Sequence, residues 1–453
     1  MNTPFKIDVS PRISRLPPYL FARINKLKYD KRVAGVDIID LGMGNPTDPT
    51  PEVVVSKLAE AAADPRNHRY SVSNGIAGLR REVAVKYRKK YGVELDPETE
   101  VIATIGSKEG FSHLCLAMLG PGDTAVVPDP AFPIHIYAVA MAGANVIRVP
   151  LGNDQAFLDR IERTIDGLYP TPKLLILNYP HNPTAVTIEP WFWERAIEMC
   201  RRRGIMIISD FAYGEINFDG YVAPSFLAAS GAKELGVEFT TMSKSYNMAG
   251  WRVGFCAGNA EMVKALATIK GYYDYGIFSP IQIAGVIAMR QCTQTPAEQS
   301  AIYQRRRDEV CRGLDKLGWT YERPRASMFV WARVSDEHLK GQGKSERTLY
   351  TYSKDLEQVE AFFGPDKRLS AILIPHVSGF LKSDALLKMH GDKDRSEITV
   401  KKTVRVFRTF LIWAKEQGYI DKLPLPQDVS LGRSANTQPE VGSAEPDPVA
   451  AAN

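Results

Sequence analysis

The stretch Thr241-Met-Ser-Lys-Ser-Tyr-Asn-Met-Ala-Gly-Trp-Arg-Val-Gly-Phe255 decides how the rest of this chain is interpreted. It places Lys244 between two serines and Arg252 eight positions later, directly after a β-rich run that ends at Thr241. A lysine can form a Schiff base with an aldehyde once an apolar pocket or a neighbouring cation destabilises its protonated form. Serine hydroxyls and an arginine fork suit a phosphate monoester. The stretch therefore indicates a covalent anchor for pyridoxal 5′-phosphate, although a solvated lysine and arginine on a surface loop would be the simpler interpretation.

The composition is that of an ordinary soluble chain. Its 453 residues are 44% hydrophobic and 24% charged, which suits two or three structural units with buried cores. The net charge of +5 is spread along the chain, so no basic block predicts a nucleic-acid groove. Five scattered cysteines without a CxxC pair indicate reduced, buried thiols rather than disulfides or a metal site. Without a signal peptide or a long apolar span, we expect a cytoplasmic protein with no membrane contact.

Strand and helix patterns alternate through the first two thirds of the chain. Helical spacing separates most of the strands and continues in a long section from about residue 260 to 317. This alternation is typical of an α/β domain with a largely parallel sheet. The β-type runs lie at residues 36–41, 100–104, 124–127, 145–149, 174–177, 205–209, 237–241 and 252–257.

The last third of the chain has a different pattern. Strands are predicted at residues 328–334, 372–374 and 403–407, although residues 406–418 also fit a helix. Residues 423–453 are rich in Pro, Ser, Ala and Asn and contain few large apolar side chains, which predicts a disordered tail.

Three polar side chains fall where predicted strands end, namely Asn182, Asp210 and Lys244. Ligands of open α/β sheets bind at the carboxyl ends of the strands. A carboxylate at Asp210 would keep a pyridine nitrogen protonated, and Asn182 and Tyr213 would hydrogen-bond the phenolate oxygen of the ring. Taken singly, Asp210 also fits a helix cap, and Asn182 before Pro183 fits a turn.

The phosphate of such a cofactor needs donors from a helix N-terminus and from hydroxyls. Gly106-Ser-Lys-Glu-Gly110 opens a helix directly after a strand, so the amides of Ser107 and Lys108 are candidates. Ser243 and Arg252 would complete the phosphate site. Phe132 would stack on the pyridine ring, although a lone aromatic residue is more often part of a core.

These motifs occur in the order found in class I/II aminotransferases of pyridoxal-phosphate fold type I, which the chain resembles over roughly residues 10 to 334. The nearest group is the bacterial alanine (glutamate–pyruvate) aminotransferases. The resemblance implies an α/β fold, with a large domain built on a mostly parallel seven-stranded sheet and a small α+β domain. The matching stretches are Arg15–Tyr19, Gly42–Pro46, His68–Ser71, Gly106–Gly110, Pro130–His135, Asn178–Thr184, Asp210–Tyr213, Ser243–Arg252 and Ala326–Trp331.

The resemblance also implies roles for these residues in amino-acid metabolism. Lys244 would be the Schiff-base lysine, with Asp210 at the ring nitrogen and Asn182 and Tyr213 at the ring oxygen. Tyr70 would reach the phosphate of a neighbouring subunit, which implies a homodimer, and Gly44 and Tyr19 would face the substrate. Ring stacking and phosphate binding would fall to Phe132, Ser107, Lys108, Ser243 and Arg252.

The resemblance weakens after Val334. The family carries a Pro-Gly turn and then an arginine that clamps the substrate carboxylate, because two hydrogen bonds fix the orientation of the amino acid. Here the nearest turn, Ile374–Phe380, has His376 in place of the glycine. Arg405, in a predicted strand, is the first candidate for the clamp, and Arg395 is the alternative.

Several functions remain open at this stage. We expect an aminotransferase that moves an amino group between an amino acid, alanine or glutamate by resemblance, and a 2-oxo acid. The alternatives are another fold type I enzyme (a lyase, decarboxylase or synthase) or a catalytically impaired paralogue that binds the cofactor. A DNA-binding regulator is disfavoured, since only about 35 residues precede the core. The predicted divisions are an arm at 1–48, a large domain at 49–300, a small domain at 301–422 and the tail at 423–453.

Overall fold

A computed structural model describes residues 7–14, 16–42, 44–334, 356, 358–364, 369–388, 394–416 and 419–425. The chain forms two compact units, Met1–Arg333 and Val334–Asn453. This division lies later than the predicted boundary at residue 300. The arm, the large domain and the small domain remain predictions. Beyond residue 425, the predicted tail lies outside the described residues.

A seven-stranded sheet forms the centre of the first unit, with strand order β1-β7-β6-β5-β4-β2-β3. Neighbouring strands are parallel except around β7, which is antiparallel to both β1 and β6. This confirms the predicted mostly parallel sheet. All five residues of β4 are buried, which explains why its first four residues are continuously apolar instead of alternating. The strands are β1 Val101–Ile105, β2 Thr124–Asp129, β3 Asn145–Pro150, β4 Leu174–Asn178, β5 Met206–Asp210, β6 Gly236–Thr241 and β7 Val253–Gly258.

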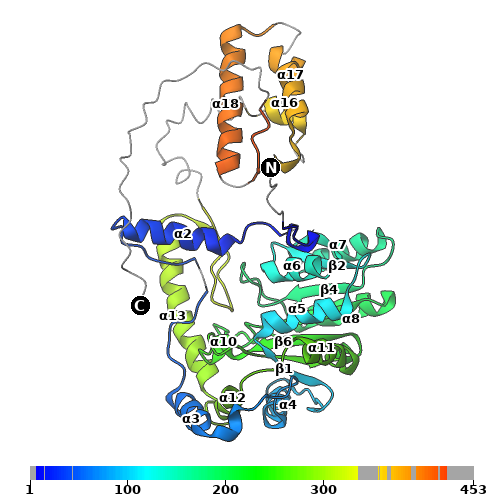
Figure 1. The fold of residues 1–453 in the computed structure, drawn as a ribbon, viewed down its shortest axis with the longest axis vertical. Helices are drawn as coiled ribbons and strands as arrows, with labels where there is room; N and C mark the ends of the chain where they lie inside the picture. The colour runs from blue at the N-terminus through cyan, green and yellow to red at the C-terminus, as the bar shows by residue number, and fades with distance from the viewer. Residues whose placement is uncertain are drawn as a thin grey trace, which may run out of the picture. The chain divides into compact units, whose positions relative to one another are not determined.

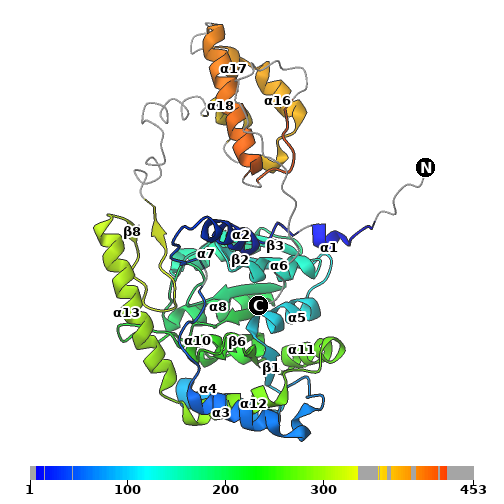
Figure 2. The same cartoon turned by 60° about the vertical axis from the view of Figure 1, so that its left-hand side comes forward.

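Helices cover both faces of this sheet (Figure 1, Figure 2). One core contains side chains of α4, α7, α8 and α12, and the other contains side chains of α5, α6 and α11. None of the described helices combines the length and apolar composition needed to cross a bilayer. The helices are α1 Pro11–Ser14, α2 Leu20–Val33, α3 Glu52–Ala63, α4 Ala77–Tyr91, α5 Ser107–Met118, α6 Pro133–Met141, α7 Gln155–Asp166, α8 Pro190–Arg203, α9 Ala232–Leu235, α10 Met242–Ser245, α11 Ala260–Tyr273, α12 Ser279–Gln291 and α13 Thr295–Lys316.

Two predicted strands of this unit differ from the structure. Residues 36–41 form no strand; Ile39 is 85% exposed and Leu41 is 82% exposed, so this apolar run has no partner strand to pair with. The strand predicted at 328–334 is reduced to β9, Ala332–Arg333, which pairs with β8, Thr320–Tyr321. Helix α7 was not predicted, although Asp154 caps it by accepting from the Phe157 amide.

The second unit is helical in its described residues. It contains η3 Leu369–Ala371, α16 Ile374–Leu381, α17 Asp384–Leu387 and α18 Glu397–Glu416. The strands predicted at 372–374 and 403–407 are therefore wrong, whereas the helix considered for 406–418 is confirmed in type and begins earlier. Val404, Phe407, Leu411 and Ala414 share one buried side of α18, because their spacing follows the helical repeat. Packing on this face outweighs the strand preference of the β-branched residues.

Candidate active site

The predicted site residues gather at the carboxyl edge of β4, β5 and β6. Asn178 and Asp210 are register partners at the ends of β4 and β5, and α10 begins directly after β6. Parallel strands present their carboxyl ends at one edge, where ligands of α/β sheets bind. The sheet order therefore brings together residues that are far apart in the sequence.

Lys244 is the central side chain of this edge. Its Nζ donates to the Gly44 carbonyl oxygen at 2.9 Å and lies 5.8 Å from the centre of the Tyr213 ring. Burial, followed by the positive charge of Arg252, lowers the pKa of Lys244 to about 8. Roughly a tenth of the amine is then neutral at pH 7, which is the form that attacks an aldehyde.

Asp210 is held by a histidine that sequence reasoning did not assign. The Asp210 Oδ2 lies 2.8 Å from Nε2 of His135, and its Oδ1 accepts from the Ala212 amide at 3.2 Å. Asp210 is 8% exposed and His135 only 2% exposed. His135 stands in the first turn of α6, three residues after Phe132, and this position after a strand end was the signal available in the sequence.

Asn178 is the second unassigned residue of the site. Its Nδ2 donates to the main-chain oxygen of Asp210 at 2.7 Å, and its Oδ1 accepts from the Asn182 amide at 2.8 Å. The side chain of Asn182 in turn lies 3.5 Å from the Tyr213 hydroxyl. Burial, then the charge of Asp210, raises the pKa of Tyr213, so its hydroxyl stays protonated at neutral pH and available as a donor.

Two glycines, Gly106 and Gly254, allow Arg252 to pack against the N-terminus of α5. A Cβ on Gly106, where φ is +73°, would lie 2.1 Å from Nη2 of Arg252. A Cβ on Gly254 would lie 2.4 Å from the Ser107 amide nitrogen. Only glycine at both positions lets the guanidinium lie against the first turn of α5, which carries Ser107 and Lys108.

Ser243 belongs to the same end of the site. Thr241 Oγ1 lies 2.8 Å from Ser243 Oγ and 3.0 Å from the Val253 carbonyl oxygen. Thr241 therefore links Ser243 to the residue that follows Arg252. Amides at a helix N-terminus, a hydroxyl and a guanidinium form a donor set that fits a phosphate.

Three other predicted residues lie near this centre, whereas Tyr70 is 85% exposed and contacts Tyr275. Phe132 precedes α6 and packs edge-on against His135, with ring centroids 5.7 Å apart. Tyr19 is reached from the site by Lys108, whose Nζ lies 5.8 Å from the centre of its ring. Gly44 lies against Phe329, where a Cβ would meet Cε1 at 2.9 Å.

The two arginine candidates for the substrate clamp lie in the second unit. Arg405 stands within helix α18 and not in a strand, so the strand on which its assignment rested is wrong. Arg395 precedes α18 and donates to the side chain of Gln358. Its neighbourhood is also not a strand of the kind that the family uses, and the clamp remains a prediction.

Comparison with known proteins places this arrangement in a family. The family profile for aminotransferase class I and II matches residues 36–362. The chain is 48% identical to the glutamate-pyruvate aminotransferase AlaC of Escherichia coli K12 over 330 residues, which cover 72% of this chain and 79% of that protein. It is 44% identical to the LL-diaminopimelate aminotransferase of Moorella thermoacetica over 323 residues, covering 71% and 83%.

A solved structure shows the same relationship. A probable N-succinyldiaminopimelate aminotransferase from Thermus thermophilus is 33% identical, with a TM-score of 0.65, and the match covers 70% of this chain and 85% of that one. The amine of Lys244, the Asp210–His135 pair and the phosphate-type donors at α5 fit the cofactor that such enzymes use. The chain belongs to the class I and II aminotransferases and is a pyridoxal-phosphate-dependent transaminase.

Proposed function

We propose that Lys244 holds pyridoxal 5′-phosphate covalently, with Asp210 at its ring nitrogen and Asn182 and Tyr213 at its ring oxygen. The observation that carries this proposal is the conjunction of Lys244, whose pKa is about 8, with a buried carboxylate fixed by His135 at a neighbouring strand end. The phosphate and the ring face would be held by Ser107, Lys108, Ser243, Arg252 and Phe132.

The residues divide the proton chemistry among themselves. When bound, the cofactor draws electrons away from the Cα of the amino acid. Lys244 would act as the general base that takes the proton from Cα, because its lowered pKa favours the neutral amine. Asp210 would keep the ring nitrogen protonated, and the protonated hydroxyl of Tyr213 would donate to the ring oxygen. The carboxylate of the substrate would be clamped by Arg405, with Arg395 as the alternative, while Gly44 and Tyr19 line the substrate side.

A homodimer is part of the proposal. Two short segments of the first unit expose aromatic and aliphatic side chains: Tyr70 is 85%, Val72 59%, Tyr272 91% and Tyr275 62% exposed, and the rings of Tyr70 and Tyr275 are in contact. Exposed apolar patches of this kind mark protein interfaces. A second copy of the chain would cover this patch, and Tyr70 would then reach the phosphate in the partner subunit.

We also propose the substrates, from similarity to a relative, and a cytoplasmic location, from the state of the cysteines. The similarity to a glutamate-pyruvate aminotransferase supports alanine or glutamate as amino donor and a 2-oxo acid as acceptor. All five cysteines are free and buried, which suits the reducing cytoplasm.

A half-reaction screen tests the function. The purified protein, loaded with the cofactor, is mixed with single amino acids while the absorption of the lysine-bound cofactor is followed. We expect loss of that band and release of a 2-oxo acid, fastest with alanine or glutamate. Release of ammonia or CO₂ would indicate another fold type I reaction. Cofactor binding without any half-reaction would indicate an impaired paralogue.

A further inference from the structure

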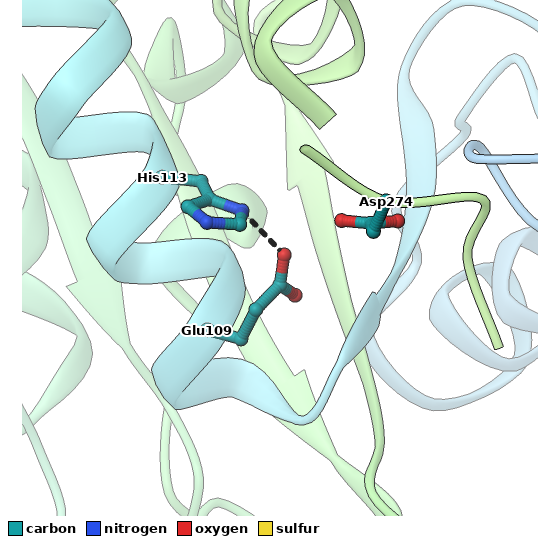
Figure 3. A group of neighbouring side chains, drawn as sticks. All are labelled: Glu109, His113 and Asp274. Atoms are coloured by element: carbon teal, nitrogen blue, oxygen red, sulfur yellow. Dashed lines mark ion pairs between the residues drawn. The ribbon is translucent and has the colours of Figure 1, made fainter. Parts of the chain in front are cut away.

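An ion-pair network around a buried lysine lies beside the proposed phosphate site and takes no part in the chemistry described above. Glu109 and His113 of α5 and Asp274 after α11 point toward one another (Figure 3). Between the two carboxylates lies Lys270 of α11, whose side chain is 0% exposed. Its Nζ is 2.9 Å from Glu109 Oε1 and 3.0 Å from Asp274 Oδ2.

This network resembles a metal site in its donor atoms but not in its charge. His113 Nδ1 lies 2.6 Å from Glu109 Oε1. Burial would raise the pKa of Glu109, but the contact with His113 and the charge of Lys270 outweigh it, so the pKa lies below its usual range. The buried ammonium therefore already pairs with both carboxylates, and a divalent ion at the same oxygens would be repelled by it.

One end of the network fixes the start of α5. Glu109 is the third residue of this helix, and its Oε2 accepts from the amide of Ile105, the last residue of β1, at 2.8 Å. The turn between them contains Gly106 and leads directly to Ser107 and Lys108, the proposed phosphate donors. Glu109 thus holds the turn that presents those amides.

The other end fixes the segment that follows Tyr70. Asp274 Oδ1 accepts from the Gly276 amide at 2.7 Å, and the Asp274 carbonyl accepts from Ser73 Oγ at 2.9 Å. Gly276 lies so close that a Cβ there would be 2.6 Å from the Val72 carbonyl oxygen. The rings of Tyr70 and Tyr275 are 4.5 Å apart. The conformation of residues 70–76 therefore depends on where Asp274 is held.

We propose that Lys270 is a positioning residue that couples the phosphate-binding turn of its own subunit to the Tyr70 segment that this subunit offers to its partner. The proposal rests on the proposed cofactor site and homodimer. Phosphate binding at α5 fixes Glu109, and Lys270 transmits that constraint to Asp274 and Ser73. Occupation of one site then orders the tyrosine that completes the other site, so the two subunits bind the cofactor with positive cooperativity.

Hydrogen exchange on the full-length protein tests the geometry without cofactor. Lys270→Met removes the buried ammonium and leaves two facing carboxylates, so a neutral triple variant, K270M/E109Q/D274N, accompanies it in case the single variant does not fold. We expect amides in residues 70–76 to exchange about tenfold faster in both variants. Lys264→Met, on the same helix at an exposed lysine, should leave them unchanged. Unchanged exchange at 70–76 in the triple variant would overturn the proposal.

Cofactor titration then tests the coupling to Tyr70. In the otherwise unsubstituted protein, Lys270→Met should weaken cofactor binding about tenfold and abolish its cooperativity. In a Tyr70→Phe background, the same substitution should weaken cofactor binding by less than about threefold, because both changes interrupt the same coupling. If Lys270→Met weakened cofactor binding by the same factor in both backgrounds, the coupling would be refuted and Lys270 would only stabilise the fold. If the unsubstituted protein shows no lysine-bound cofactor band, the cofactor site itself is refuted, while the exchange experiment still decides the geometry.

Discussion

The two units of this chain present chemistry in different ways. In the first unit, polar motifs stand at the ends of buried parallel strands, so the sheet order alone brings Asn182, Asp210 and Lys244 to one edge. In the second unit, the described helices pack around an apolar core that includes Phe380 and Phe407. The family profile ends at residue 362, so it covers nearly all of the first unit and little of the second. A fixed strand end makes a side chain's position predictable, whereas an amphipathic helix shows only which face is buried.

The largest expected effect tests whether the chemistry belongs to the first unit. Lys244→Ala removes the amine that we propose binds the cofactor and moves the Cα proton, and it should lower kcat by at least about 10⁴-fold. The lysine-bound cofactor band should disappear with it. Lys264→Ala, at an exposed position of α11, is the matched control and should leave both unchanged. Full turnover in the Lys244 variant would refute the site.

The next effect concerns the residue that the sequence did not reveal. His135→Ala leaves Asp210 Oδ2 without its partner, and the loss of a hydrogen bond to a charged group should lower kcat about 30-fold to 100-fold. Cofactor affinity should fall as well, if Asp210 binds the ring nitrogen as proposed, because the carboxylate is then no longer fixed. Steady-state kinetics and cofactor titration measure both. An unchanged kcat would mean that Asp210 is positioned well enough by Asn178 and the Ala212 amide.

The contrast between His135 and Lys244 shows what the sequence could predict. Lys244 carries a local signal, a lysine between serines after a strand, and Asp210 ends a strand of its own. His135 contacts Asp210, which is 75 residues away in the sequence, and the contact exists because β4 alone separates β2 from β5 in the sheet. Residue types and spacing do not contain that adjacency, so the sheet was predictable while this partner was not.

The second unit shows the other limit. Residues 403–407 combine β-branched and aromatic side chains, which favour a strand, with a spacing to Leu411 and Ala414 that favours a helix. The helix forms because this spacing lets one face of it pack into the apolar core of the second unit. The strand predicted at 372–374 fails in the same way, because residues 372 and 373 only connect η3 to α16, which begins at Ile374. A short apolar run does not by itself distinguish the two structures.

A moderate effect would show whether the second unit takes part in catalysis. If Arg405 clamps the substrate carboxylate, Arg405→Ala should raise the KM for the amino acid about tenfold or more, because a bidentate charged contact is lost. Arg395→Ala is the matched comparison and should change KM less than about twofold. An unchanged KM in both variants would confine the chemistry to the first unit.

The smallest expected effect is a difference between the two units in how their unfolding free energies depend on pH. Glu238 on β6 is completely buried, and burial raises its pKa to about 7 although Ser225, Phe226, Tyr87 and Ser209 donate to it. The folded state therefore holds a proton that the unfolded state releases above its usual pKa near 4.5. Its stabilising contribution is complete below that value and is lost as the pH rises through about 7.

Denaturant unfolding of the full chain at pH 5 and pH 8 measures this contribution. Between pH 5 and pH 8 the unfolding free energy of the first unit should fall in both proteins. The fall should be roughly 1–3 kcal/mol larger in the unsubstituted protein than in the Glu238→Gln variant. The described core cluster of the second unit is built from apolar residues, so its transition should move equally in both proteins. A pH dependence that survives unchanged in the Gln variant would assign it to other groups, since Gln has the shape of Glu238 but cannot ionise.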